Sequence, residues 1–180
     1  MASFKIVGGK TLKGEIHPQG AKNEALQILC ATLLSPEKIT IRNIPDIRDV
    51  NKLIELLGSM GVEVHRESPS VCTFKAEKVD FNYMKSEEFK SKATALRGSI
   101  MLVGPLLARF GVGYIPQPGG DKIGRRRVDT HFMGFQKLGA TFHFNAKENF
   151  FEVKGSSRDS GKGYIISKNN YIIHTFLGYK

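Results

Sequence analysis

Residues 48–64 of the chain read RDVNKLIELLGSMGVEV, and residues 126–142 read RRVDTHFMGFQKLGATF. The two stretches align without a gap. Matched positions share apolar or glycine character: Val50 with Val128, Leu57 with Phe135, Gly61 with Gly139, and Val64 with Phe142. Upstream, residues 33–34 correspond to 106–107, and downstream, residues 71–74 correspond to 150–153. Matches in the same order along the chain predict an internal repeat, and therefore two copies of one structural unit.

Each copy is predicted to form helix, strand, helix, strand, strand. The first helix of each copy, residues 23–34 and 96–110, is apolar nearly all round and should be buried. The second helix is amphipathic, with apolar stripes at Val50, Leu53, Ile54 and Leu57 in one copy and at Val128, Phe132, Phe135 and Leu138 in the other. Alternating segments predict strands at residues 39–41, 62–64, 71–74, 112–114, 142–144 and 150–153, with a hairpin turn at 145–149. These patterns predict an α+β fold of repeated βαβαββ-like units, with buried helices and surrounding sheets.

Composition limits the class of protein. The 180 residues suffice for a domain with its own core, and no run of about 18 apolar residues is present to span a membrane. The N-terminus lacks the apolar centre of a signal peptide, so a cytoplasmic protein is expected. Cys30 and Cys72 lie in apolar segments and are interpreted as buried thiols. The formal net charge of +10 indicates anionic partners, but it does not choose among RNA, membrane surfaces and phosphorylated metabolites.

The segment from Pro118 to His131, PGGDKIGRRRVDTH, carries the strongest functional pattern. Its glycines permit backbone conformations closed to other residues, and residues 125–127 are three arginines before a helix that should begin near Val128. Arginine side chains beside the N–H groups of a helix N-terminus suit phosphate or diphosphate, although a solvated basic turn is the alternative. Asp121, at the tip of this loop, is either a general acid or a turn-forming residue.

A second candidate segment, residues 20–24, lies at the start of the first buried helix. A lysine at this point, Lys22, is expected to meet an anion, whereas Asn23 is equally explained as a helix N-cap. A further charged group is interpreted instead as solvated surface, because acidic and basic residues alternate within it: Lys85, Glu87, Glu88, Lys90 and Lys92.

Three segments together resemble a known family: residues 18–25, residues 96–99 leading into Gly104-Pro105, and residues 119–129. They look like the UDP-N-acetylglucosamine 1-carboxyvinyltransferases, the enolpyruvyl transferases of the first committed step of bacterial peptidoglycan synthesis. The similarity runs from about Phe4 to Val153. The shikimate-pathway enolpyruvyl transferase shares the fold, but the segments Ala-Lys-Asn-Glu-Ala and Gly-Arg-Arg-Arg-Val-Asp favour the peptidoglycan enzymes.

The resemblance implies a fold and a reaction. The fold is an inside-out α/β barrel type with two domains, each of three repeated units, and an active site between them. The reaction transfers the enolpyruvyl group of phosphoenolpyruvate to the 3-hydroxyl of UDP-N-acetylglucosamine and releases phosphate, with no metal or organic cofactor. Residues 1–21 would pack on the second domain, 22–154 would form two repeats of the first domain, and 155–180 would be a divergent tail in place of the third repeat.

The resemblance also assigns roles to residues by motif position. Lys22 would contact phosphoenolpyruvate, Asn23 the sugar or the tetrahedral intermediate, and Arg97 and Arg126 the phosphates. Asp121 would protonate the methylene carbon of phosphoenolpyruvate, so the catalytic roles fall on Asp121, Lys22 and Arg97. The UDP part would be lined by Arg127, Val128, Asp129 and Thr130.

Asp121 stands where most members of the family carry a cysteine. The epoxide antibiotic fosfomycin disables those members by forming a thioether with that cysteine, so we expect insensitivity to fosfomycin here.

Little or no turnover is expected from the chain alone, because a second domain and the carboxylate that would deprotonate the sugar hydroxyl are missing. Self-association through the open edge of the repeat set is an additional expectation. Two other functions stay open: an inactive remnant, and a basic RNA-binding module on the same repeat fold. No aromatic residues alternate with the arginines, which argues against nucleic acid, and nothing in the chain indicates a membrane partner.

Overall fold

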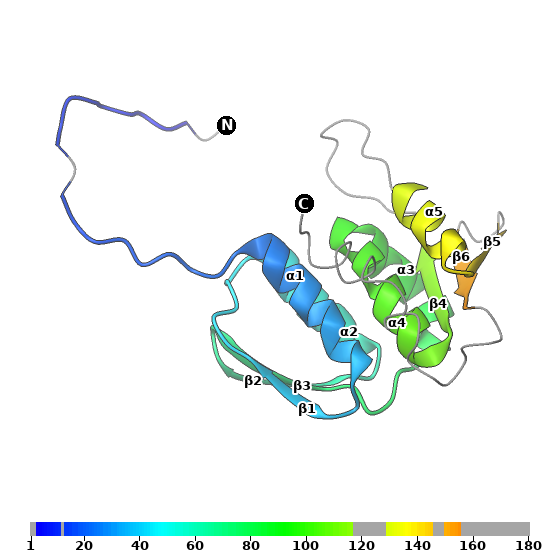
Figure 1. Ribbon diagram of the computed structural model, residues 1–180. Helices are drawn as coiled ribbons and strands as arrows, with labels where there is room; N and C mark the ends of the chain where they lie inside the picture. Colours follow the sequence, from blue (N-terminus) through cyan, green and yellow to red (C-terminus); the bar gives the residue numbers. More distant parts are fainter. Residues whose placement is uncertain (1–2, 12, 117–128, 146–149, 156–180) are drawn as a thin grey trace.

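The computed structural model describes residues 3–11, 13–116, 129–145 and 150–155, and it confirms the α+β class (Figure 1). Of the helices in these ranges, none has the length and apolar character that a membrane span requires. The elements, with η for a 3-10 helix, are α1 (Lys22–Ala31), η1 (Thr32–Leu34), β1 (Lys38–Ile41), α2 (Arg48–Ser59), β2 (Glu63–Ser68), β3 (Val71–Lys75), η2 (Tyr83–Lys85), α3 (Glu87–Thr94), η3 (Arg97–Leu102), α4 (Val103–Phe110), β4 (Val112–Pro116), α5 (Asp129–Lys137), β5 (Thr141–Asn145) and β6 (Phe150–Lys154).

Two three-stranded sheets share one topology. Their strand orders are β1-β3-β2 and β4-β6-β5, so the last strand of each copy lies in the middle, and every neighbouring pair is antiparallel. In Figure 1, α1 and α2 cover one face of the first sheet, while α5 lies beside the second. Each copy therefore repeats the same path of helix, strand, helix, strand, strand.

The end of the second helix is built identically in the two copies. Gly61 and Gly139 both have φ of 94°, a left-handed conformation that favours glycine. The residue after each glycine donates its backbone N–H to the helix, from Val62 to the Leu57 carbonyl and from Ala140 to the Phe135 carbonyl. The glycines matched in the sequence thus close the same helix cap, which turns the chain into the next strand.

The predicted helix at residues 96–110 is a 3-10 helix, η3, followed by the α-helix α4. An α-helix that began at Leu96 would need an N–H at position 105 to bond the Met101 carbonyl, and Pro105 has none. With α4 starting at Val103, Pro105 falls in the first turn, where the N–H groups have no partner inside the helix. The proline therefore fixes the point at which the 3-10 geometry ends.

Of the charged group interpreted as solvated surface, Lys85 ends η2 and the other residues lie in α3, and the interpretation was wrong for Lys90, which is buried. Ser86 begins the helix, and its hydroxyl accepts a hydrogen bond from the Phe89 N–H. Lys90 is buried, and its ammonium lies 2.8 Å from the Glu87 carboxylate. Lys92 joins α3 to α2, since its Nζ lies 3.2 Å from the Glu55 carboxylate.

The core lies between the helices and the inner faces of the sheets. Phe74, in the central strand β3, is fully buried and pairs in register with Ile39 and Val64. The second sheet is covered on both faces: Phe151 and Val153 pack towards α5, and on the opposite face Phe150 stacks on Tyr114 at 5.4 Å, beneath α3. The predicted buried thiols are confirmed, because Cys30 and Cys72 are free and inaccessible.

An extended arm precedes α1 and points away from the body (Figure 1). Its large apolar side chains are exposed, with 95% of Phe4, 91% of Ile6 and 88% of Ile16 accessible. Apolar side chains in such a row normally lie against another surface.

Candidate functional site

Lys22 is the first residue of α1, and its ammonium meets a carboxylate from the next helix. The Nζ atom lies 3.0 Å from Oδ2 of Asp49, which belongs to the first turn of α2. Both side chains are about half exposed, so an incoming anion has access to Lys22. The sequence predicted that Lys22 would meet an anion, and in the described residues this anion is Asp49.

Arg97 opens η3, and His131 lies in the first turn of α5. Burial lowers the pKa of His131, and the positive charge of Arg97 lowers it further. The second copy of the repeat therefore places a cationic side chain and a histidine at helix starts, where the first copy places Lys22 and Asp49.

The start of η3 lies beside α1. A Cβ added at Gly98, the residue after Arg97, would lie 3.3 Å from the Leu26 side chain, which is one turn along α1 from Lys22. The starts of α1, α2 and η3 thus lie on one side of the body. Helix starts present unpaired N–H groups and a partial positive charge, so this region favours anionic ligands such as phosphate.

His131 and Asp49 were absent from the predicted site. In the gapless alignment of the repeats, His131 corresponds to Leu53, a fully buried core residue of α2. The Nδ1 atom of His131 is itself buried and has no hydrogen-bond partner among the described residues. A histidine opposite a core leucine was the signal in the sequence that would have found it.

We predict that stability falls in mildly acidic solution because of His131. Burial, and next the charge of Arg97, lower its pKa below the ordinary value of 6.5. As the pH falls, His131 therefore takes up a proton in the unfolded chain before it does so in the folded one. Its contribution to stability is fully present above about pH 6.5 and is lost as the pH drops from there through the lowered pKa. Between pH 7.5 and pH 5.5 the melting temperature should fall less for His131→Gln than for the unaltered chain. An equal fall in both proteins would contradict the prediction.

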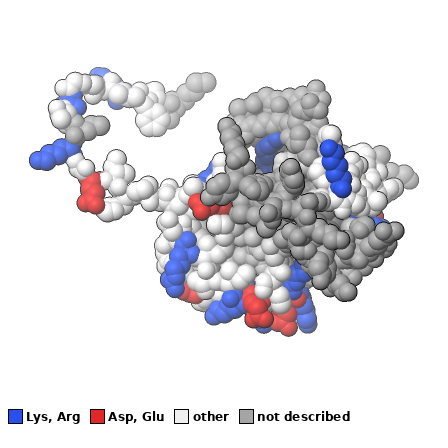
Figure 2. Space-filling model, in the orientation of Figure 1, with Lys and Arg blue, Asp and Glu red and all other residues white. Residues whose placement is uncertain are grey.

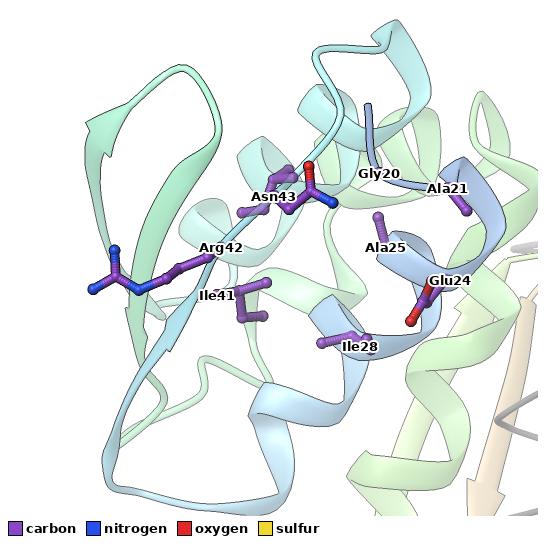
Figure 3. A pocket seen from close by; sticks show the side chains of 9 residues that line it. Gly20, Ala21, Glu24, Ala25, Ile28, Ile41, Arg42 and Asn43 are labelled. Atoms are coloured by element: carbon purple, nitrogen blue, oxygen red, sulfur yellow. The ribbon is translucent and has the colours of Figure 1, made fainter. Parts of the chain in front are cut away.

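A tight backbone junction fixes the start of α1. Asn43 has φ of 58°, rare for a residue with a side chain, and its carbonyl oxygen lies 2.1 Å from where a Cβ of Gly20 would be. Beside this junction a small cavity of about 90 Å³ opens between α1 and the end of β1 (Figure 3). It is lined by Gly20, Ala21, Glu24, Ala25, Ile28, Ile41, Arg42, Asn43 and Ile44. Lys22 and Asn23 follow the junction directly, so its geometry positions them.

Gly20→Ala is expected to lower the free energy of unfolding by about 1–3 kcal/mol, the usual cost of overpacking. The added methyl would overlap the Asn43 carbonyl, and the start of α1 would have to move. Gly8→Ala is the matched control, since a Cβ there has no neighbour within 4 Å. Urea unfolding of both variants checks this; an unchanged midpoint for Gly20→Ala would refute the junction argument.

Several predicted site residues lie outside the described ranges: Asp121, Arg126, Arg127 and Val128. Asp129 and Thr130 are the first two residues of α5. Asn23 is exposed next to Lys22, and Arg97 is partly buried. Among the described residues, the structure therefore brings the neighbourhoods of Lys22 and Arg97 together at the helix starts.

Comparison with known proteins decides the family. The sequence pattern described as EPSP synthase (3-phosphoshikimate 1-carboxyvinyltransferase) matches residues 6–169. The chain belongs to this family. A solved structure, the enolpyruvyl transferase NikO from Streptomyces tendae, has the same fold: its TM-score is 0.64 at 21% identity, over 83% of this chain and 31% of that chain.

The chain also shares more than half of its aligned residues with curated relatives. The chain is 58% identical to proteins named UDP-N-acetylglucosamine 1-carboxyvinyltransferase from Bacteroides thetaiotaomicron and Bacteroides fragilis, over 85% and 98% of its length. A protein of the same name from Porphyromonas gingivalis is 56% identical over 93%. The alignments cover 35%, 42% and 38% of those relatives, so the chain spans about two fifths of their length.

Proposed function

We propose that this chain supplies one part of a UDP-N-acetylglucosamine 1-carboxyvinyltransferase, acting in the cytoplasm at the first committed step of peptidoglycan synthesis. The complete protein would transfer the enolpyruvyl group of phosphoenolpyruvate to the 3-hydroxyl of UDP-N-acetylglucosamine and release phosphate. The observation that carries the proposal is the identity of 56–58% to proteins of that name across most of the chain. The meeting of helix starts beside Lys22 and Arg97 supports an anionic substrate.

The proposed chemistry is an addition followed by an elimination. The sugar hydroxyl oxygen bonds to the carbon that bears the phosphate and gives its proton to the carboxylate expected from the second domain, while the methylene carbon takes a proton from Asp121 and becomes a methyl group. That methyl group then returns a proton to the Asp121 carboxylate as phosphate leaves, which restores the double bond. Lys22 and Arg97 would stabilise the negative charge of phosphoenolpyruvate, together with Arg126.

The remaining proposed roles concern binding. Asn23 would contact the sugar or the tetrahedral intermediate, and Arg127, Val128, Asp129 and Thr130 would line the UDP part. The described start of α5 at Asp129 is consistent with such a site, since a helix N-terminus suits a diphosphate.

The rest of the family fold would complete the site. The two described repeats would be joined by a third in an inside-out barrel, and a second domain would close over the helix starts. The exposed Phe4, Ile6 and Ile16 of the arm support its packing on that second domain. Turnover is therefore proposed for the complete protein and not for this chain alone.

An RNA-binding function receives less support from the surface. In Figure 2 the lower edge of the body, near the β1-β3-β2 sheet, shows acidic and basic side chains mixed on the visible face. Lys75, the last residue of β3, lies 2.6 Å from Glu77 and 3.8 Å from Glu63. The phosphate backbone of a nucleic acid is bound by a continuous stripe of basic side chains. Lysines that are paired with carboxylates do not form such a stripe.

Two measurements test the proposal. A chimera joins residues 1–154 of this chain to the remaining C-terminal part of the Bacteroides fragilis relative, and phosphate release is followed with both substrates. Turnover by the chimera, with little by the 180-residue chain, is expected; a chimera that folds but releases no phosphate would sink the proposal. Calorimetry of the chain with UDP-N-acetylglucosamine and with RNA separates the two binding functions.

The proposed role of Asp121 predicts insensitivity to fosfomycin. A carboxylate cannot form the thioether that the epoxide makes with a cysteine, so the chimera should keep its phosphate release in the presence of the drug. Its mass should also stay unchanged, whereas Asp121→Cys should gain one fosfomycin adduct and lose activity. A covalent adduct on Asp121 itself would disprove this prediction.

A further inference from the structure

Side-chain hydrogen bonds join strand β2 to the loop in front of α2. Nη2 of Arg66 donates to Oδ1 of Asn51 at 2.8 Å, and Nδ2 of Asn51 donates to Oδ1 of Asp46 at 2.7 Å. The other terminal nitrogen of Arg66, Nη1, donates to the Pro69 carbonyl at 2.9 Å, in the turn between β2 and β3. The Arg66–Asn51–Asp46 network thus ties the hairpin to the loop.

The second copy of the repeat forms the same strands without this network. Phe144 stands two residues beyond Phe142 in β5, as Arg66 stands two residues beyond Val64 in β2. The Phe144 ring packs on Phe151 at 4.7 Å. The bonds of the first copy are exposed, and substitutions at such places change stability little. The repeated unit therefore folds without the arginine, so the network has another reason.

One end of the loop reaches the side chain of Lys22. The bond between Asp46 and Asn51 closes the segment that contains Asp49, in the first turn of α2. The Asp49 carboxylate lies 3.0 Å from Nζ of Lys22. The network therefore restrains the turn that orients the ammonium.

The other end of the loop reaches the backbone of Lys22. The Asn43 carbonyl oxygen lies 2.1 Å from where a Cβ of Gly20 would be, two residues before Lys22. The next residue, Ile44, donates its backbone N–H to the Ser70 carbonyl at 2.9 Å, in the same hairpin turn that accepts a bond from Arg66. The hairpin is therefore connected to both determinants of the position of Lys22.

We propose that Arg66 is a positioning residue for Lys22, which it holds in place through Asn51, Asp46 and the loop of residues 43–47. The inference rests on the proposed function, which gives the ammonium a phosphoenolpyruvate to contact. A side chain displaced by about 1 Å can slow a reaction by about 100-fold, so a hairpin away from the substrate can govern turnover.

Reversal of the bond between Asp46 and Asn51 provides the decisive variants. Arg66→Met removes the first link. Asn51→Asp keeps an acceptor for Arg66 but sets a carboxylate against Asp46, so it breaks only the link to the loop. The Asp46→Asn/Asn51→Asp double variant restores one donor and one acceptor with their places exchanged. Each single variant should therefore release Lys22, and the double variant should hold it again.

Nitrogen NMR of the lysine ammonium groups in the 180-residue chain tests the positioning without substrate. The signal of Lys22, assigned by its absence from Lys22→Met, should shift in Arg66→Met and in Asn51→Asp and return in the double variant. Melting temperatures should change by less than about 2 °C. His65→Gln, at the neighbouring position of β2, is the matched control and should leave the signal in place. A signal that ignores both single variants, or that the double variant does not restore, would overturn the inference.

Turnover of the chimera shows whether the positioning acts on the substrate. Arg66→Met and Asn51→Asp should each raise the KM for phosphoenolpyruvate about 10-fold and change that for UDP-N-acetylglucosamine less than about twofold. In a Lys22→Met background, Arg66→Met should have no further effect, and an additional rise in KM would refute the route through Lys22. If the NMR signal responds as expected while Lys22→Met itself leaves turnover intact, the positioning is supported and the proposed function of Lys22 is contradicted.

Discussion

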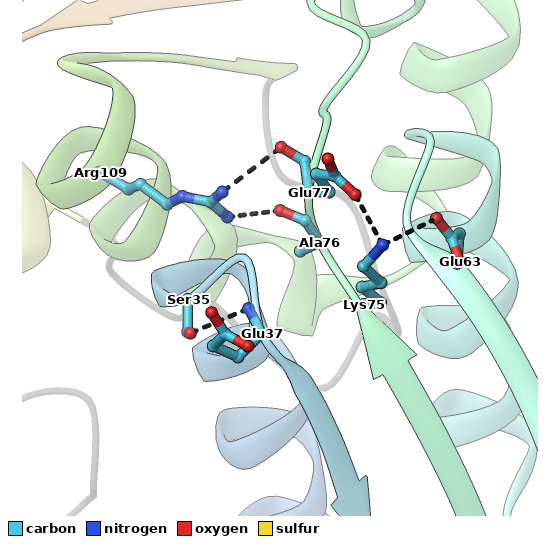
Figure 4. Close-up of polar contacts among 7 residues, drawn as sticks. All are labelled: Ser35, Glu37, Glu63, Lys75, Ala76, Glu77 and Arg109. Carbon is cyan, nitrogen blue, oxygen red and sulfur yellow. Dashed lines mark hydrogen bonds and ion pairs between the residues drawn. The ribbon is translucent and has the colours of Figure 1, made fainter.

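Arg109→Met is expected to lower the free energy of unfolding by about 2–4 kcal/mol, since hydrogen bonds from a charged group contribute about 1.5–3 kcal/mol each. Arg109 extends from α4, in the second repeat, to backbone carbonyls of the first. Its guanidinium donates to the Leu33 carbonyl at 3.1 Å. It also donates to the Ala76 carbonyl at 2.5 Å and, through a longer bond, to the Glu77 carbonyl at 3.4 Å (Figure 4). Both Leu33 and Ala76 are buried, so methionine would leave their carbonyls without these donors.

Two further variants make the Arg109 prediction specific. Arg109→Lys should recover only part of the loss, because one ammonium cannot spread its donors across separate carbonyls as the planar guanidinium does. Arg42→Met, at an exposed arginine after β1, should leave stability unchanged and controls for loss of charge. Urea unfolding measures all three, and equal stability of Arg109→Met and Arg42→Met would show that Arg109 does not hold the repeats together.

The helices and strands could be predicted wherever the same sequence pattern occurs in both copies of the repeat. Gly61 and Gly139 could be matched in the sequence because only glycine closes this helix cap readily, and the strands after them follow from that turn. The same comparison missed the switch from η3 to α4. There Pro105 sets the geometry, and the apolar pattern continues across both helices.

The candidate site was less predictable, because its pairs join residues far apart in sequence. Lys22 was expected to meet an anion, but Asp49 reaches it only because α1 and α2 begin side by side. In the second copy the charge of Arg97, from η3, acts on His131, from α5, across 34 positions of the sequence. Periodicity shows which face of a helix is buried, and it does not show which side chains of different helices meet.

Lys22→Met in the chimera is expected to reduce phosphate release about 10²- to 10³-fold, the usual loss when one group that stabilises a developing negative charge is removed. The reason lies in the placement of the ammonium. It is the first side chain of α1, it is half exposed, and the Gly20 junction fixes its backbone. Lys22→Arg keeps the charge but changes the shape of the donor, so a partial loss is expected.

Asp49→Asn provides the matched comparison for Lys22. In the structure the Asp49 carboxylate lies 3.0 Å from Nζ, so it holds the lysine in one orientation while also competing with the substrate for it. The amide should therefore reduce turnover much less than Lys22→Met does, and the Lys22→Met/Asp49→Asn double variant should be no worse than Lys22→Met alone. If the loss of turnover in the double variant equals the product of the two single losses, Asp49 affects the reaction independently of Lys22. Full activity of Lys22→Met would remove Lys22 from the proposed mechanism.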